Sequence, residues 1–212
     1  MYRKFIKRIF DILLSLILII ICSPIFIIIS ILVSIKMGFP FLFKQERIGK
    51  NETEFTLYKF RTMTEKKDKD GKLLPEKERV TKLGAFLRSS SLDELPELFC
   101  ILKGEMSFVG PRPMPTYYGP YFLKNERKRH LVTPGLIPPD SLSQKTYTSY
   151  EEQFKYEIYY AENISFILDL KVILTTLKIL LNRMETNYGT ELDRPHLNIY
   201  RKNMDNKKME EK

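Results

Sequence analysis

The sequence predicts an α+β fold that is mainly helical, and three features support this class. An apolar segment near the N-terminus, Ile12 to Ile35, contains no charged residue. A run of alternating aromatic and polar residues, Phe55 to Thr62, is typical of a β-strand. Residues 150–163 and 166–183 have the composition of helices, and the second is amphipathic. We expect a membrane hairpin over residues 1–36, a small cytosolic domain over 37–190 with a short β element, and a polar tail over 191–212.

The composition limits the function classes that fit. The 212 residues include 35 Lys and Arg against 26 Asp and Glu, so the net charge of +9 favours anionic partners: phosphates, nucleic acid or an acidic membrane surface. A charged fraction of 29% excludes a protein with many membrane spans, and a hydrophobic fraction of 43% excludes a wholly disordered chain. Two cysteines and two histidines give neither a disulfide framework nor a zinc motif.

The apolar segment is a membrane element with two possible paths. As a continuous helix rising about 1.5 Å per residue, it is long enough for a hydrocarbon core about 30 Å thick. Pro24 removes a backbone donor at its midpoint, and the Ser23 hydroxyl can bond back into the preceding turn. Basic residues stand at both ends: Arg3, Lys4, Lys7 and Arg8 before it, and Lys36, Lys44, Arg47 and Lys50 after it. We favour a re-entrant hairpin, because a spanning helix prefers basic residues on one side; a simple kinked anchor is the alternative.

The remaining segments complete the predicted domain. Residues 65–78 are charged and contain an Asp-Gly turn signal, so they are an exposed loop, and residues 83–102 are helical. In the helix over 166–183 one face carries Phe166, Leu170, Ile173, Leu177 and Leu181, whereas Asp169, Thr176 and Arg183 lie off it. This helix either lies at the membrane interface or packs against the domain core, with equal weight. The polar chain from Asn203 is expected to be disordered.

An acidic stretch, Ser91 to Glu97, has two interpretations. Ser91 followed three residues later by Glu94 fits a helix capping box, which is a structural role. Alternatively, Asp93 and Glu94 are adjacent carboxylates that can divide the roles of nucleophile and Mg²⁺ ligand. In that interpretation Arg88 attracts phosphate and keeps the carboxylate ionised. The residues by themselves favour the capping box.

Two further features suggest an anion site. Lys59 and Arg61 lie two residues apart on the predicted strand and so point to the same face, where they form either a phosphate clamp or a solvated edge. Pro111 and Pro113 bracket Arg112 and fix the backbone that presents its guanidinium group. The alternative for this second feature is an ordinary proline-rich turn with a surface arginine.

At this point the chain resembles a known family. The runs Lys-Phe-Arg-Thr-Met (59–63), Arg-Ser-Ser-Ser-Leu-Asp-Glu-Leu-Pro-Glu-Leu (88–98) and Gly-Glu-Met-Ser-Phe-Val-Gly-Pro-Arg-Pro (104–113) are similar to those of bacterial sugar transferases. These are the monotopic phosphoglycosyl transferases that initiate glycan assembly on a polyprenol carrier. The resemblance covers residues 1–183, includes the run Asn-Ile-Ser-Phe-x-Leu-Asp-Leu-Lys (163–171), and outweighs the capping box.

The resemblance implies an activity and a set of site residues. Family members move a phosphosugar from a UDP-sugar to undecaprenyl phosphate and release UMP, in two steps and with Mg²⁺. They dock on the cytoplasmic face of the bacterial inner membrane, against its phospholipid, through a re-entrant hairpin and interfacial helices. By position, Asp93 matches the nucleophile and Glu94 the neighbouring metal-binding acid, and both are candidate metal ligands. The candidate substrate-binding residues are Lys59, Arg61, Arg88, Pro111, Arg112, Pro113 and Glu157.

One loop departs from the family pattern. Many members continue after Arg-His with x-Val-Arg-Pro-Gly-Ile-Thr-Gly-Trp-Ala-Gln-Val, whereas this chain has Thr133 in place of the arginine and reads Pro-Pro-Asp-Ser-Leu from Pro138. An acid that is commonly aspartate is Glu157 here. The nucleophile, the metal acid and the Pro-Arg-Pro element are intact, so we expect activity with a divergent sugar specificity.

Two other function classes compete with the transferase. A membrane-docked scaffold that keeps the fold but has lost turnover would explain the altered loop, and the intact Asp93-Glu94 pair argues against it. A nucleic-acid binder would explain the net charge but leaves the apolar segment without a purpose, and the sequence has no base-reading motif. We therefore expect no nucleic acid among the partners.

Overall fold

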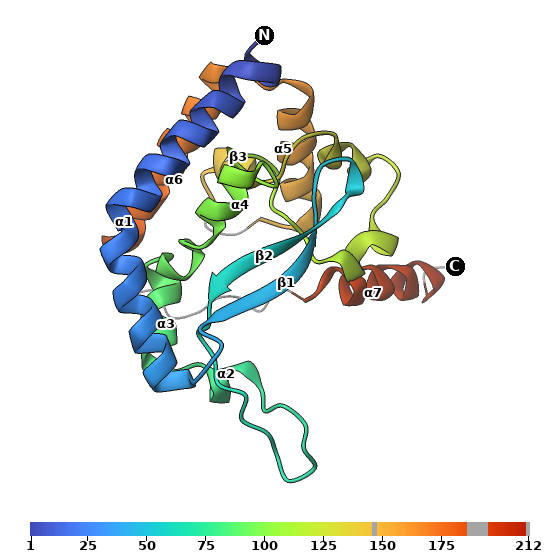
Figure 1. Cartoon of the computed structure of the whole chain (residues 1–212). Coiled ribbons are helices and arrows are strands. Elements are labelled where there is room, and N and C mark those ends of the chain that lie inside the picture. The colour runs from blue at the N-terminus through green and yellow to red at the C-terminus, as the bar shows by residue number, and fades with distance from the viewer. Residues whose placement is uncertain (146–147, 186–194, 211–212) are drawn as a thin grey trace. The chain divides into compact units, whose positions relative to one another are not determined.

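The computed structural model describes residues 1–145, 148–185 and 195–210, and these are mainly helical (Figure 1). Short strands accompany the helices, which confirms the predicted α+β class with a small β element. The α-helices are α1 (Lys7–Met37), α2 (Glu76–Arg79), α3 (Lys82–Ser89), α4 (Glu97–Lys103), α5 (Tyr150–Glu162), α6 (Phe166–Glu185) and α7 (Leu197–Glu210). The strands are β1 (Leu42–Ile48), β2 (Glu54–Phe60), β3 (Ser107–Val109) and β4 (Gly135–Ile137).

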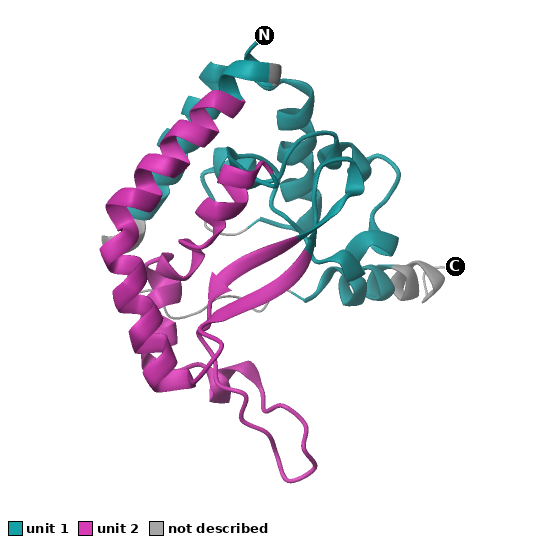
Figure 2. Cartoon of the chain, in the orientation of Figure 1, with its two compact units in different colours: residues 1–7, 47–55, 105–212 teal, residues 8–46, 56–104 magenta. Residues whose placement is uncertain are grey.

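The chain forms two compact units (Figure 2). Unit 1 comprises residues 1–7, 47–55 and 105–212, and unit 2 comprises residues 8–46 and 56–104. Strand β1 pairs with β2, and β3 pairs with β4 in parallel. The three-part division at residues 36 and 190 stays a prediction.

Helix α1 contains Pro24 and continues through it. A proline has no N–H for the carbonyl four residues earlier, and the Ser23 hydroxyl donates a 2.8 Å hydrogen bond to that carbonyl, on Ile20. The predicted bond from Ser23 into the preceding turn is therefore confirmed. The helix changes direction along its length, as expected for an internal proline (Figure 1). A pair of antiparallel helices is not seen in the described segment 7–37, so the re-entrant path stays a prediction.

Most of α1 is exposed although it is strongly apolar. An 18-residue window has a mean hydropathy of 3.2, and only 11% of it is buried. The helix is long and apolar enough to cross a membrane, and its exposure separates it from the core helix of a soluble domain. Its second half contributes to a core of unit 2, where Ile29 and Val33 pack with Phe60 and Leu87.

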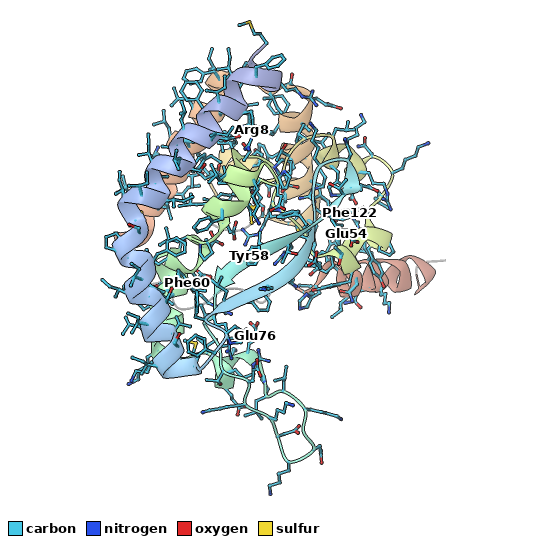
Figure 3. All side chains as sticks on the ribbon, in the orientation of Figure 1. Arg8, Glu54, Tyr58, Phe60, Glu76 and Phe122 are labelled. Atoms are coloured by element: carbon cyan, nitrogen blue, oxygen red, sulfur yellow. The ribbon has the colours of Figure 1, made fainter. Side chains whose placement is uncertain are left out.

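Basic residues that precede the apolar segment make contacts inside each unit. In unit 1 the Lys7 ammonium lies 2.7 Å from a carboxylate oxygen of Asp169. In unit 2 the Arg8 guanidinium donates to the carbonyls of Ile101 and Leu102 at 2.6 and 2.7 Å, and so caps the last turn of α4 (Figure 3). Lys7 and Arg8 therefore pair with a carboxylate and with backbone carbonyls of the protein itself. The comparison of basic residues on the two sides of the apolar segment does not take such pairing into account. The side chain of Lys4 lies outside the described residues.

Unit 2 places the acidic stretch between two short helices. Thr81 caps α3 because its hydroxyl accepts a 2.9 Å hydrogen bond from the N–H of Gly84. Gly84 itself lies against the backbone of Thr62, where a Cβ atom would overlap the carbonyl, so α3 is held close to the chain that follows β2. The helical segments predicted over residues 83–102 are confirmed. The exposed loop predicted over residues 65–78 is confirmed as far as Pro75, where α2 follows.

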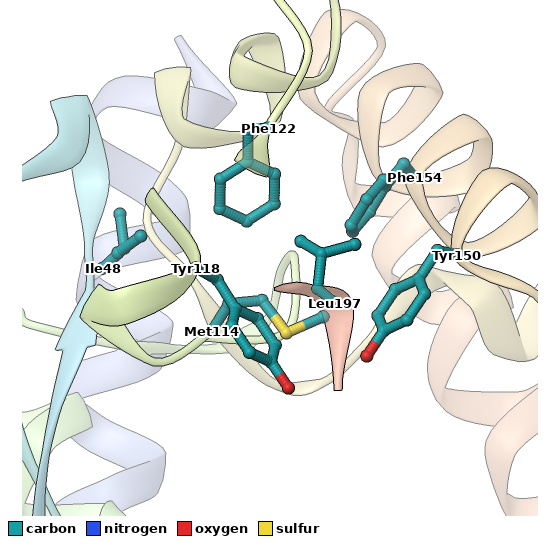
Figure 4. Close-up of a cluster of buried hydrophobic side chains, with 7 residues drawn as sticks. All are labelled: Ile48, Met114, Tyr118, Phe122, Tyr150, Phe154 and Leu197. Carbon is teal, nitrogen blue, oxygen red and sulfur yellow. The ribbon is translucent and has the colours of Figure 1, made fainter. Parts of the chain in front are cut away.

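Unit 1 contains a core that includes the C-terminal helix (Figure 4). Leu197, the first residue of α7, is fully buried and packs with Ile48, Met114, Tyr118, Phe122, Tyr150 and Phe154. Tyr118 donates to or accepts from His196 at 2.8 Å, and Arg201 forms an ion pair with Glu126. The prediction of a disordered chain from Asn203 is wrong as far as Glu210, because helix α7 continues to that residue. Residues 211–212 lie outside the described chain.

Helix α6 packs on a second core of unit 1 and leaves its apolar stripe exposed. Leu168 and Val172 are buried with Val109, Val132 and Tyr160. The predicted apolar face is largely exposed: Phe166, Leu170, Leu177 and Leu181 are 44% to 64% accessible, and Ile173 is partly buried. Asp169, expected off that face, is buried, and its carboxylate accepts hydrogen bonds from Tyr2, Lys7 and Tyr160. The side chain of Arg183 lies outside the described residues.

Candidate functional site

The predicted site residues form two groups, one in each unit. The carboxylate group belongs to unit 2 and consists of Lys59, Arg88, Asp93 and Glu94. The Pro-Arg-Pro group belongs to unit 1 and consists of Pro111, Arg112, Pro113 and Glu157. Each group is described by itself.

The two carboxylates lie in a 3-10 turn, Leu92–Glu94, between α3 and α4. Ser91 precedes this turn in the left-handed conformation, with φ 55°, and its side chain makes no capping hydrogen bond. A capping box needs an extended Ser91 whose hydroxyl binds the N–H three residues later. The capping-box interpretation is therefore wrong, and Glu94 is available for other contacts.

Asp93 is buried although it carries a carboxylate. It is 9% exposed, whereas aspartate is ordinarily a surface residue. Burial raises the pKa of the Asp93 carboxyl above its usual value, and the negative charge of Glu94 adds to the rise. The positive charges of Lys59 and Arg88 act in the opposite direction. The expected influence of Arg88 is thus present, and burial outweighs it.

Lys59 connects the acidic stretch to the β element. It lies near the end of β2, and its ammonium is 2.5 Å from Glu94 Oε1 and 3.2 Å from Glu97 Oε1. Glu97 is almost fully buried, so this ion pair is shielded from solvent on that side. Sequence reasoning did not select Glu97, although it belongs to the same acidic stretch.

The two predicted arginines of unit 2, Arg88 and Arg61, have different surroundings. Arg88 is partly exposed, and its Nε donates a 2.9 Å hydrogen bond to the Thr62 hydroxyl. Arg61 instead donates to the carbonyls of Gly38 and Pro40 at 3.3 and 3.0 Å, and its guanidinium lies 3.5 Å from Glu65. Arg61 therefore fixes the turn after α1, and the structure does not place it with Lys59 at the carboxylates.

The Pro-Arg-Pro group follows β3 directly. Strand β3 is parallel to β4, with Ser107 opposite Gly135 and Val109 opposite Ile137. Gly110 and Gly135 allow the two backbones to approach, because a Cβ atom on either would collide with the other strand. Pro111 and Pro113 are buried while Arg112 is exposed, so the bracketing prolines do present an arginine at the surface of unit 1.

A buried ion pair holds the backbone of Arg112. Its N–H donates to Glu157 Oε1 at 2.9 Å, and its carbonyl accepts from the Arg129 guanidinium at 2.5 Å. Arg129 Nε in turn donates to Glu157 Oε2 at 2.6 Å, and Gln153 donates to Oε1 at 2.9 Å. Glu157 and Arg129 are 0% and 1% exposed. In this structure Glu157 is thus a positioning residue that orients Arg112 through its backbone.

The site prediction missed Arg129, which holds the Arg112 backbone, and its neighbour His130. Arg129 also lies over the rings of Phe122 and Phe154, and it contacts His130 at 3.1 Å. Burial and the charge of Arg129 lower the pKa of His130 to about 4, so the imidazole is neutral at pH 7. The signal for these two residues in the sequence is the Arg-His pair itself. In the comparison with the family pattern this pair served only to mark where the divergent loop begins.

Comparison with known proteins gives a consistent result. A family model described as bacterial sugar transferase matches residues 2–183. A protein of Bacillus subtilis (strain 168) described as an uncharacterized sugar transferase, EpsL, is 42% identical over 188 residues, which cover 87% of this chain and 93% of that protein.

Two longer relatives have named activities. A UDP-glucose:undecaprenyl-phosphate glucose-1-phosphate transferase of Klebsiella pneumoniae is 36% identical over 84% of this chain. An undecaprenyl-phosphate galactose phosphotransferase of Salmonella typhimurium is 31% identical over 85% of this chain. The match spans 40% and 41% of the length of these two relatives.

Proposed function

The chain belongs to the bacterial sugar transferase family, and we propose its function on that basis. The proposed reaction transfers a phosphosugar from a UDP-sugar to undecaprenyl phosphate and releases UMP, which initiates assembly of a surface glycan. The acceptor is supported by relatives named as undecaprenyl-phosphate sugar phosphotransferases. The observation that carries the chemistry is the buried Asp93 beside Glu94 and Lys59.

Asp93 is the proposed nucleophile. Its carboxylate oxygen forms a bond to the sugar-bearing phosphorus while the bond from that phosphorus to the UMP oxygen breaks. The resulting acyl phosphate holds the phosphosugar on Asp93. A phosphate oxygen of the lipid then attacks the same phosphorus and frees the carboxylate. The low exposure of Asp93 supports this path, because an acyl phosphate sheltered from water survives until the lipid reacts.

The cations of the two groups have separate proposed roles. Lys59 is fixed by Glu94 and Glu97, so its ammonium is held in place to stabilise negative charge that develops on the transferred phosphoryl group. Arg88 is partly exposed and offers a guanidinium to a phosphate. Arg112, whose backbone is fixed by Glu157 and Arg129, is proposed to bind a phosphate of the UDP-sugar.

Mg²⁺ is the proposed cofactor, and the donor set fits it. Asp93 and Glu94 supply carboxylate oxygens, which this ion prefers, and Mg²⁺ sites commonly use one or two carboxylates completed by substrate phosphates and water. Among the described residues, no group of three or more acidic, histidine or cysteine side chains could hold a metal ion by itself. When bound, the ion would neutralise charge on the diphosphate.

The proposed location is the cytoplasmic face of the inner membrane. An exposed apolar helix, together with relatives that act on a polyprenyl phosphate, indicates membrane association. We propose that α1 enters and leaves the same face at its Pro24 bend, and that the exposed stripe of α6 lies at the interface. Both elements would keep the catalytic residues near a lipid-borne acceptor.

The test is UMP release by detergent-solubilised protein with Mg²⁺, undecaprenyl phosphate and a panel of UDP-sugars. Asp93→Asn keeps the shape of the side chain and removes the nucleophilic charge. Asp70→Asn makes the same change on an exposed loop of unit 2 and serves as the matched control. We expect lipid-dependent turnover by the wild-type protein and by Asp70→Asn, and none by Asp93→Asn. Equal turnover by wild type and Asp93→Asn would exclude Asp93 as the nucleophile, and silence of all three would favour the scaffold.

A further inference from the structure

The loop that departs from the family pattern forms a fixed structure in unit 1. Strand β4 ends at Ile137, and a 3-10 helix covers Pro139–Ser143. Pro138 and Pro139 fix the backbone at its start, and Leu142 packs against the core that contains α6. Such a loop holds the side chains of its middle residues in place before any ligand arrives.

Asp140 lies in this loop with one carboxylate oxygen satisfied and the other not. Its Oδ2 accepts a 3.0 Å hydrogen bond from the hydroxyl of Thr148, which is itself buried. Oδ1 is also buried, and among the described residues it has no hydrogen-bond partner. Because Thr148 fixes the rotation of the carboxylate, the direction in which Oδ1 accepts a hydrogen bond is fixed too.

Ser141, the next residue, repeats this arrangement. Its hydroxyl oxygen is buried and likewise lacks a partner within the described chain. Two adjacent buried polar atoms without partners are unusual, since native proteins satisfy nearly all such groups. Both residues remain partly exposed, so these atoms lie just beneath the surface, where the polar groups of a ligand can complete them.

The Asp140 carboxyl responds to the charge of the arginine that the proposed function assigns to phosphate. Burial raises the pKa of the Asp140 carboxyl, Glu157 raises it further, and the positive charge of Arg112 acts against both. The carboxyl therefore lies within electrostatic reach of Arg112 and of the residue that holds the Arg112 backbone. A donor bound by Arg112 through a phosphate would bring its adjoining sugar to Asp140.

We propose that Asp140 and Ser141 form the sugar-recognition site of this enzyme, where they bind a hydroxyl or amide N–H of the sugar carried by the UDP donor. This inference rests on the proposed transferase function. A carboxylate oxygen only accepts, so it selects a sugar that offers a hydrogen-bond donor at that position, and the hydroxyl of Ser141 either donates or accepts. A site of this kind rejects a sugar that lacks the donor, because the buried oxygen then stays unpaired.

The test compares the sugar preference of matched variants. Asp140→Asn keeps the shape of the side chain. If the amide oxygen still accepts from the Thr148 hydroxyl, the amide N–H takes the place of Oδ1, so a hydrogen-bond acceptor becomes a donor. Asp140→Ala removes the acceptor altogether. Ser141→Ala removes the unpaired hydroxyl, and Ser143→Ala is the control, because that hydroxyl on the same loop already accepts from the N–H of Lys145. The measurements are kcat/KM for UDP-glucose, UDP-galactose and their N-acetylamino counterparts, the inhibition constant of UMP, and the melting temperature.

We expect both Asp140 variants to lower kcat/KM for the preferred UDP-sugar by about 10- to 100-fold, the effect of one hydrogen bond to a charged group. The ratio to the least preferred sugar should shrink by the same factor, while UMP inhibition and the Ser143→Ala values stay unchanged. If the variants stay active and the ratio of kcat/KM between the two sugars is unchanged, the sugar-recognition proposal is overturned while the proposed transferase function stands. Equal weakening of UMP inhibition would also overturn it, since the loop would then contact the nucleotide. A wild-type protein that uses no UDP-sugar would overturn the proposed function first.

Discussion

The buried pair of Arg129 and Glu157 allows a quantitative test of how the Pro-Arg-Pro element is held. Glu157→Leu leaves the Arg129 guanidinium buried without its carboxylate, and Arg129→Met leaves the carboxylate buried without its cation. Removing one partner of a buried ion pair costs about 3–5 kcal/mol of unfolding free energy. Each single variant should therefore be destabilised by that amount.

The double variant should cost much less than the sum of the two. It removes both charges, so the remaining cost comes from neutral groups that lose partners: the N–H and carbonyl of Arg112, the amide of Gln153 and the imidazole of His130. At about 1 kcal/mol each this is about 4 kcal/mol, against about 6–10 kcal/mol for the two single changes added. The double-mutant cycle should give a coupling of about 2 kcal/mol or more.

The assay is urea unfolding of wild type, both single variants and the double variant in one detergent, followed by circular dichroism. Additive free energies would refute the argument, because they would mean that Glu157 does not stabilise the charge of Arg129. A further variant, Glu157→Asp, introduces the shorter acid. It should lose part of the coupling, since it cannot reach both Arg129 and the Arg112 N–H in the present backbone.

Two more predictions concern unit 1. The pKa of His130 is about 4 in the folded protein against an ordinary 6.5, so the unfolded chain binds the proton more readily. The contribution of His130 to the free energy of unfolding is therefore complete above pH 6.5 and falls by about 3 kcal/mol as the pH drops toward 4. His130→Gln should flatten this part of a plot of unfolding free energy against pH, and an unaltered slope would assign the effect to another group. Leu197→Ala should destabilise by about 2–5 kcal/mol, because Leu197 is fully buried, while Ile199→Ala, at an exposed position of the same helix, should change stability by less than about 0.5 kcal/mol. Equal melting temperatures for these two variants would show that α7 does not contribute to the core.

The elements that the sequence predicted well have strong local signals. The Ser23 bond to the carbonyl freed by Pro24 follows from proline chemistry alone, and it is present. The strand over β2 and the helices α5 and α6 follow from residue type and spacing. The prediction of a disordered chain from Asn203 failed because helix α7 is stabilised by one buried leucine and by ion pairs to distant residues, which no local pattern reveals.

The sequence displays the residue types of the candidate site but not the contacts that these residues make. Adjacent acids and a bracketed arginine are visible in the sequence, but the burial of Asp93 and the reversal of its pKa shift depend on surrounding chain. The same limit explains Arg61, whose spacing from Lys59 left a phosphate clamp and a solvated edge both open. It lies just beyond the end of β2, where its guanidinium instead donates to carbonyls of the turn after α1.

The most direct test of the central claim is to find the phosphosugar on Asp93. The protein is incubated with Mg²⁺ and its UDP-sugar without the lipid acceptor, quenched, and digested with trypsin, which releases residues 89–103 as one peptide. We predict a gain of one phosphosugar mass on Asp93, at most one UMP released per protein, and loss of the label when undecaprenyl phosphate is added. An unlabelled peptide from protein that turns over when both substrates are present would contradict the account.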